Sequence, residues 1–131
     1  MIKRLLELLE VSSAPYSHFN VAAIVVDANG NKYEGVNVES AAYGATLCAE
    51  RNAISAAITS GMKSGEVAEV HIIARNEAGT ILPVQACGIC RQVIAEQSHD
   101  KATVFRYDEN GLAGQDQISD LLPGAFLGAD L

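Results

Sequence analysis

Three cysteines constrain this 131-residue chain more than any other feature of its sequence. Cys87 and Cys90 form a Cys-x-x-Cys pair, while Cys48 stands far upstream and is followed two positions later by Glu50. Each of the two cysteine stretches opens a segment that we expect to be helical. If the three sulfurs are to meet, the fold must bring the starts of two helices to one place, where their dipoles create positive potential and favour thiolates.

The number of cysteines also predicts which kind of metal site they form. Zinc binds thiolate and imidazole tetrahedrally, with four protein ligands in structural sites and three plus a water in catalytic ones. Only three cysteines exist, and no histidine lies at ligand spacing from them. The spacing therefore favours a catalytic zinc ion, with Glu50 close enough to act on water. A thioredoxin-like redox pair and plain buried cysteines are the alternatives.

Composition excludes several classes of protein. Hydrophobic residues make up 49% and charged residues 19%, which predicts one globular domain over residues 1–131. The net charge of −7 argues against a nucleic acid polymer as partner, because such partners require a basic surface. An odd number of cysteines is typical of a reduced, cytoplasmic protein. Charges interrupt the first eleven residues, so we expect neither a signal peptide nor a membrane partner.

The hydrophobic pattern predicts alternating strands and helices. Ile2, Leu5, Leu6 and Leu9 form the stripe of an amphipathic helix. Thr46 is the expected N-cap of a helix beginning near Leu47, and Ile58 and Ile89 are expected to face inward. We expect strands at 21–27, 32–38, 67–74, 103–107 and 112–117, and further helices at 87–97 and 118–122. This order predicts an α/β sandwich with a mixed sheet and a hairpin at its start.

The cysteine stretches resemble a known family. Cys48-Ala49-Glu50 followed by Cys87-Gly88-Ile89-Cys90 is similar to the signature of the zinc-dependent nucleoside and nucleobase deaminases. Other stretches resemble the small homotetrameric cytidine deaminases, in order from about Ala14 to Phe126. These are Pro15-Tyr16-Ser17-His18-Phe19, Asn37-Val38-Glu39 with Ala42-Tyr43, Cys90-Arg91-Gln92-Val93 and Leu121-Leu122-Pro123-Gly124-Ala125-Phe126.

The resemblance implies a three-layer α/β/α sandwich with a roughly five-stranded mixed sheet. It also implies hydrolytic deamination of cytidine and 2′-deoxycytidine to uridine and 2′-deoxyuridine, with release of ammonia, in pyrimidine salvage. One zinc ion per chain would be held by Cys48, Cys87 and Cys90. Glu50 would be the proton shuttle, with the backbone amide of Ala49 helping to orient the reacting groups. Arg51 is the candidate for a hydrogen bond to a ligand sulfur.

The same resemblance implies how a nucleoside substrate is bound. Phe19 would stack on or flank the pyrimidine, while Asn37 and Glu39 would hydrogen-bond the ribose hydroxyls. In a homotetramer, Tyr43 would lie near a subunit boundary and Phe126 would reach a neighbouring subunit's site.

The sequence departs from the family at Ala86, where proline usually precedes the first cysteine of the pair. Proline would pre-set the turn, so we expect a modest effect on rate or stability. One alternative function is the same zinc chemistry on another aminated heterocycle, such as a nucleoside antibiotic or a free base. The other is a redox or zinc-binding module without hydrolytic activity, against which Glu50 argues.

Overall fold

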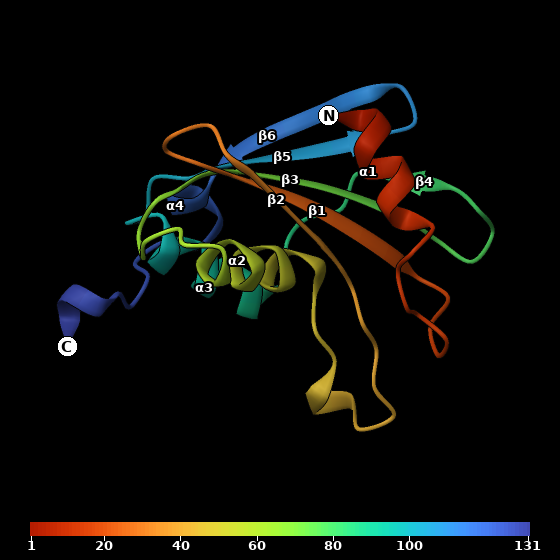
Figure 1. Ribbon diagram of the computed structural model, residues 1–131, viewed down its shortest axis with the longest axis horizontal. Helices are drawn as coiled ribbons and strands as arrows, with labels where there is room; N and C mark the ends of the chain where they lie inside the picture. Colours follow the sequence, from red (N-terminus) through yellow and green to blue (C-terminus); the bar gives the residue numbers. More distant parts are fainter.

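The computed structural model describes residues 1–131 and shows a mixed sheet with helices on both faces (Figure 1). Helix α1 lies on one face, and α2 and α3 lie on the other, which confirms the three-layer sandwich. The elements in chain order are α1 (Ile2–Leu9), β1 (Asn20–Asp27), β2 (Lys32–Val36), the 3-10 helix η1 (Tyr43–Ala45), α2 (Ala49–Thr59), β3 (Val67–Arg75), β4 (Ile81–Leu82), α3 (Gly88–Gln97), β5 (Thr103–Asp108), β6 (Gly111–Gln117), α4 (Ile118–Leu121) and the 3-10 helix η2 (Gly128–Asp130).

The sheet has the strand order β2-β1-β3-β5-β6. Strands β3 and β5 pair in parallel, and the chain between them passes through α3, as a parallel connection requires. All other pairs are antiparallel, including the short β4, which joins the end of β3 at Ala74 and Arg75. The sequence predicted the five main strands but missed β4, because its two residues are too few to show a period.

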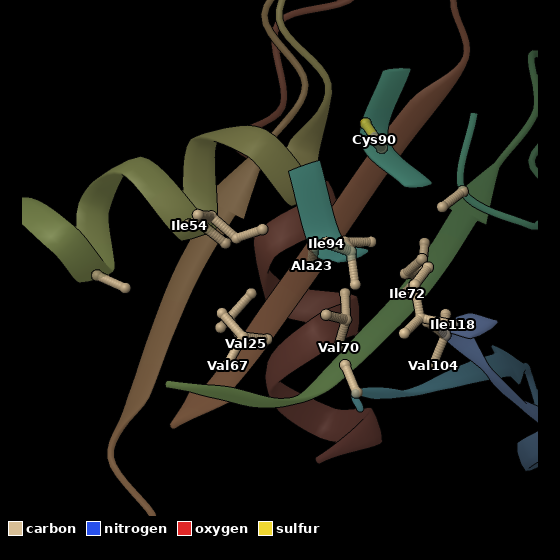
Figure 2. Close-up of a cluster of buried hydrophobic side chains, with 14 of the residues drawn as sticks. Ala23, Val25, Ile54, Val67, Val70, Ile72, Cys90, Ile94, Val104 and Ile118 are labelled. Atoms are coloured by element: carbon tan, nitrogen blue, oxygen red, sulfur yellow. The ribbon is translucent and has the colours of Figure 1, made fainter. Parts of the chain in front are cut away.

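The two faces of the sheet bury different sets of side chains. On the α2/α3 face, Ile54 of α2 and Ile94 of α3 belong to one buried cluster with residues of the strands, and Figure 2 shows Ile94 next to Val70 and Ile72 of β3. On the α1 face, the leucines of α1 cover residues of β1, β3 and β5. Strand β1 is buried on both sides, from Ala22 to Val25, as its continuous apolar run predicted.

Helix α2 packs unusually close to strand β2. A Cβ atom at Gly35 would lie 2.4 Å from the carbonyl oxygen of Ala49 and from the backbone nitrogen of Ala53. The alanines of α2 and the glycine of β2 therefore permit backbone contact that larger side chains would prevent. The expectation that Ile58 and Ile89 face inward was wrong, since 44% and 63% of them are exposed.

None of the helices combines the length and the hydrophobicity needed to cross a lipid bilayer.

Candidate metal centre

Cys48 and Cys87 occupy the same structural position, the N-cap of α2 and of α3 respectively. Both have extended backbones, and neither sulfur makes a capping hydrogen bond, so both sulfurs remain available as ligands. The expectation that Thr46 caps α2 was wrong. Its hydroxyl instead accepts a hydrogen bond from the backbone N–H of Ser40, 3.1 Å away, and the helix begins at Ala49 with Cys48 as its N-cap.

The structure brings the three sulfurs together. Those of Cys48 and Cys87 are 3.7 Å apart, and all three lie within 4.8 Å of one another. Thiolates bound to one tetrahedral zinc ion, at about 2.3 Å each, stand about 3.8 Å from one another. Cys90, one turn into α3, is fully buried, whereas Cys87 is exposed. The donor set and its spacing fit zinc with three thiolate ligands.

The surroundings of Cys48 favour its thiolate form. A hydrogen bond from the Cys90 thiol and another from Arg51, whose Nη2 is 3.4 Å from the sulfur, lower the pKa of Cys48 to about 5. Both helix N-termini add positive potential at this point. Arg51 therefore lies where the sequence predicted, beside a sulfur.

Glu50 is buried between the two helices, with only 4% of its surface exposed. Its Oε2 lies 3.7 Å from the sulfur of Cys90. Burial and the charge of the Cys48 thiolate raise the pKa of this carboxyl above its ordinary value. A raised pKa makes this carboxyl a better proton acceptor than an ordinary glutamate, as a general acid and base requires.

A cavity of about 330 Å³ opens beside the sulfurs. Most of its lining is apolar, with a few polar groups among the lining residues, as is typical of small-molecule sites. The lining residues are Phe19, Val21, Asn37, Thr46, Leu47, Cys48, Ala49, Glu50, Val84, Gln85 and Cys87.

A second hollow of about 210 Å³ adjoins this cavity, and the two share Thr46. We call it the side hollow. Glu39 and Tyr43 line it, and neither contributes to the cavity beside the sulfurs. Its lining residues are Tyr16, Ser17, Glu39, Ser40, Tyr43 and Thr46.

The amide of Asn37 is held in one orientation. Its Oδ1 accepts hydrogen bonds from the N–H of Val21 at 2.8 Å and from the hydroxyl of Ser12. Its Nδ2 donates to the carbonyl of Phe19 at 2.8 Å. An amide nitrogen carries two hydrogens, so Asn37 retains one N–H that it can donate to a ligand.

The sequence-predicted residues thus divide into groups. Phe19, Asn37 and Ala49 line the same cavity as Cys48, Cys87 and Glu50. Cys90 and Arg51 do not line the cavity but contact residues that do, namely Glu50 and Cys48 respectively. Phe126 lines neither space: it is 59% exposed, and its carbonyl accepts a hydrogen bond from Gln92.

Sequence reasoning missed five lining residues, namely Val21, Thr46, Leu47, Val84 and Gln85. All but Val21 lie within three positions of a cysteine that caps a helix. That proximity is the signal that could have identified them, because the residues before an N-cap face the same space as the cap.

The loop that carries Cys87 is anchored without proline. Ala86 is buried, and its carbonyl accepts a hydrogen bond from Nε of Arg91 at 2.8 Å. The same guanidinium donates to the carbonyl of Leu121 at 2.9 Å. Arg91 therefore ties the loop to α3 and to the end of α4.

A wider hollow, of about 570 Å³, lies on another part of the surface, between residues 12–20 and 75–79. It contains no cysteine, and its Arg75 is already paired with Glu10. Its size alone therefore does not make it a reaction site.

Comparison with known proteins gives a consistent result. The family model described as "Cytidine and deoxycytidylate deaminase zinc-binding region" matches residues 1–106. The cytidine deaminase of Halalkalibacterium halodurans is 36% identical over 131 residues, covering 100% of this chain and 95% of that protein. That of Sporosarcina psychrophila is 38% identical over 122 residues, covering 93% and 85%. The crystal structure of cytidine deaminase from Burkholderia pseudomallei superposes with a TM-score of 0.85 at 35% identity, covering 95% of each chain.

Proposed function

The chain belongs to the cytidine and deoxycytidylate deaminase family, and we propose that it hydrolyses cytidine and 2′-deoxycytidine to uridine and 2′-deoxyuridine with release of ammonia. The observation that carries this proposal is the buried Glu50 beside three convergent sulfurs at the end of a cavity. Zinc binds here, one ion per chain, and when bound it makes a water molecule nucleophilic and stabilises developing negative charge. Cys48, Cys87 and Cys90 would be its ligands.

Glu50 would move the protons of the reaction. It takes a proton from the attacking water and delivers it to N3 of the cytosine ring, which makes C4 electrophilic. After the water oxygen has bonded to C4, the carboxylate takes the remaining proton from that oxygen and delivers it to the amino group, which leaves as ammonia while the oxygen becomes the C4 carbonyl. The raised pKa of Glu50 supports this role, because it makes the carboxylate a stronger base toward the attacking water. The backbone amide of Ala49, at the start of α2, would help to orient the reacting groups.

The remaining lining residues suit a nucleoside. Phe19 would stack on or flank the pyrimidine in the apolar cavity. A sugar hydroxyl both donates and accepts hydrogen bonds. The free N–H of Asn37 and the carboxylate of Glu39 would supply the two matching partners. A carboxylate at this position would also repel a phosphate, which favours free nucleosides over nucleotides.

We propose further that the site is completed in a homotetramer. Tyr43 is 81% exposed and Phe126 is 59% exposed, although both are large aromatic side chains. They lie on the segment between β2 and α2 and on the C-terminal segment, both of which project from the body of the chain (Figure 1). Tyr43 would lie near a subunit boundary, and Phe126 would reach a neighbour's cavity.

The cellular role is also a proposal. We propose that residues 1–131 act as one catalytic domain, in the cytoplasm, in the salvage of pyrimidine nucleosides. The three free thiols support a reducing compartment, since zinc ligation requires reduced cysteines.

The two alternative functions have less support. A redox module would need no buried carboxylate beside its cysteine pair, yet Glu50 lies 3.7 Å from Cys90. A free base would leave Asn37 and Glu39 without a sugar to bind. Another aminated nucleoside, such as a nucleoside antibiotic, is a less supported substrate, because the full-length relatives above are named cytidine deaminases.

The first experiment follows the ultraviolet absorbance of cytidine incubated with the purified protein and with Glu50→Gln. We expect the wild type to consume cytidine, and the variant to be slower by about 10²–10⁴-fold. Glu109→Gln, on the exposed β5–β6 turn, is the matched control and should behave as wild type.

Zinc content, measured on all three proteins, separates the possible outcomes. A wild type that holds zinc but leaves cytidine unchanged would refute the substrate assignment, and other aminated nucleosides would then be screened. A Glu50→Gln protein that works at the wild-type rate would refute the proton shuttle and leave the metal site standing.

A further inference from the structure

The loop between α1 and β1 encloses the carboxylate of Glu39. The backbone N–H groups of Tyr16 and Ser17 donate to Oε1 of Glu39, at 3.0 and 3.1 Å. The hydroxyl of Ser17 donates to the other oxygen, Oε2. Ser17 is the only residue of the chain whose side chain contacts this carboxylate through a hydrogen bond.

The same hydroxyl is also tied to Phe19. Oγ of Ser17 accepts a hydrogen bond from the backbone N–H of Phe19 at 3.0 Å. Phe19 lines the cavity beside the sulfurs, whereas Ser17 and Glu39 line the side hollow. One hydroxyl group therefore connects the residue facing the pyrimidine with the residue facing the sugar.

The acceptor capacity of Glu39 shows what this arrangement does. An ionised carboxylate has about four acceptor positions. Two are occupied on Oε1 by N–H groups, and one is occupied on Oε2 by Ser17. About one position remains, on Oε2, for a hydroxyl of a ligand. The hydrogen bond from Ser17 also lowers the pKa of Glu39, which keeps the carboxylate ionised as an acceptor.

We propose that Ser17 is a positioning residue, which holds Oε2 of Glu39 in place to accept one sugar hydroxyl and thereby sets the preference for hydroxylated sugars. This inference rests on the proposed function, and it concerns a residue that does not itself touch the reacting atoms. The contact is solvent-exposed, so we expect its effect to be moderate.

The test compares two substrates and four proteins. The substrates are cytidine and 2′,3′-dideoxycytidine, which lacks both hydroxyls that Glu39 could bind. The proteins are the wild type, Ser17→Ala, Ser17→Thr and Ser13→Ala. Ser13 is exposed in the same segment and its side chain makes no hydrogen bond, so Ser13→Ala is a matched control with the same chemical change.

We expect Ser17→Ala to raise KM for cytidine by about three- to tenfold, with kcat within about twofold of the wild type. Its KM for 2′,3′-dideoxycytidine should stay within about twofold. Ser17→Thr keeps the hydroxyl, so its KM for cytidine should be close to that of the wild type. Ser13→Ala should match the wild type. An equal loss on both substrates would overturn the proposal, as would an unchanged KM for cytidine.

A double variant tests whether Ser17 acts through Glu39. If it does, adding Ser17→Ala to a Glu39→Ala variant should not raise KM for cytidine any further. An additional loss of the size seen in the single variant would show that Ser17 acts elsewhere.

A titration without substrate keeps this inference separate from the proposed function. The carboxyl carbon of Glu39, followed by nuclear magnetic resonance, should show a higher pKa in Ser17→Ala than in Ser13→Ala. If this shift is found while no variant turns over cytidine, the proposed function falls and the hydrogen bond stands. If cytidine is turned over but the shift is absent, the role of Ser17 falls and the proposed function stands.

Discussion

Glu50 and His71 are buried titratable side chains on opposite faces of the sheet, and only Glu50 lines a cavity. Glu50 lies on the α2/α3 face and His71 on the α1 face, with 4% and 6% of their surfaces exposed. Glu50 lines a cavity together with the sulfurs. His71 stacks on Phe105 at 4.6 Å between ring centroids, and its Nδ1 lies 2.8 Å from the hydroxyl of Tyr107.

This difference shows how to judge a buried charged or polar group. His71 is surrounded by aromatic partners, and it lines none of the pockets of the chain. Glu50 has sulfurs on one side and an accessible cavity on the other. Burial by itself shifts the pKa of both groups, but only the group that faces a cavity can exchange protons with a ligand. Four predictions test this contrast, from the largest expected effect to the smallest.

Removing the metal should abolish the activity of the site on the α2/α3 face. In the native protein we expect the three thiols to be unreactive toward Ellman's reagent, and three per chain to react after chelation, because metal ligation protects thiolates. Activity should fall to background and return with added zinc. A reversible Cys87–Cys90 disulfide that leaves only Cys48 to react would instead support a redox module.

Truncation on the α1 face should reduce stability and leave catalysis intact. Leu9 is fully buried in α1, and Leu9→Ala should lower the free energy of unfolding by about 2–5 kcal/mol. Urea denaturation measures the change. Leu112→Ala is the control, because Leu112 is exposed on β6 and its loss should cost less than about 0.5 kcal/mol. A kcat for folded Leu9→Ala well below the wild-type value would show that the faces are not independent.

The α1 face should also make stability depend on pH. Burial lowers the pKa of His71 below its ordinary value, with the carboxylate of Glu69 opposing this shift. The unfolded chain therefore binds more protons than the folded one, so the contribution is present above about pH 6.5 and is lost as the pH falls. The free energy of unfolding is measured at pH 7.5 and at pH 5. We expect it to fall less between these two pH values in His71→Gln than in the wild type. Equal decreases in both proteins would refute this account.

The smallest effect concerns the loop before Cys87. The backbone N–H of Ala86 donates to no backbone acceptor, so a proline there would remove no such hydrogen bond. Ala86→Pro should raise the free energy of unfolding by about 0.4–1 kcal/mol by restricting the unfolded chain. We expect kcat to change by less than about twofold, because Arg91 already anchors the loop. If neither thermal stability nor turnover rises, proline is not needed to tighten this turn.

Much of the fold was predictable because it depends on local patterns. The apolar run of β1, the hairpin that joins β1 to β2 and the stripe of α1 each depend on patterns within a few residues. The errors occurred where contacts outside the helix itself decide how a side chain is oriented. The hydroxyl of Thr46 bonds to Ser40 and not to its own helix, and Ile89 faces outward although it follows a helical period.

The site was predictable to a different extent in its two parts. The spacing of the cysteines and Glu50 identified the metal end, because a metal ion demands particular ligand types in particular number. The side hollow was harder to identify. Ser17 and Thr46 carry ordinary hydroxyl groups, and their relation to Glu39 exists only once the loop before β1 has folded against the segment after β2.

The sequence by itself determined the chemistry available to this protein: three thiolates, one carboxylate beside them, and an alternation of strands and helices able to carry them. Only the tertiary structure decided the distances: sulfurs within 4.8 Å, a carboxylate that is buried but open to a cavity, and a histidine that is buried and closed. The physical reason is the separation along the chain of the residues on which each property depends. Ligand preference and local periodicity belong to single residues and short segments, whereas burial and convergence arise from contacts between segments far apart in the chain.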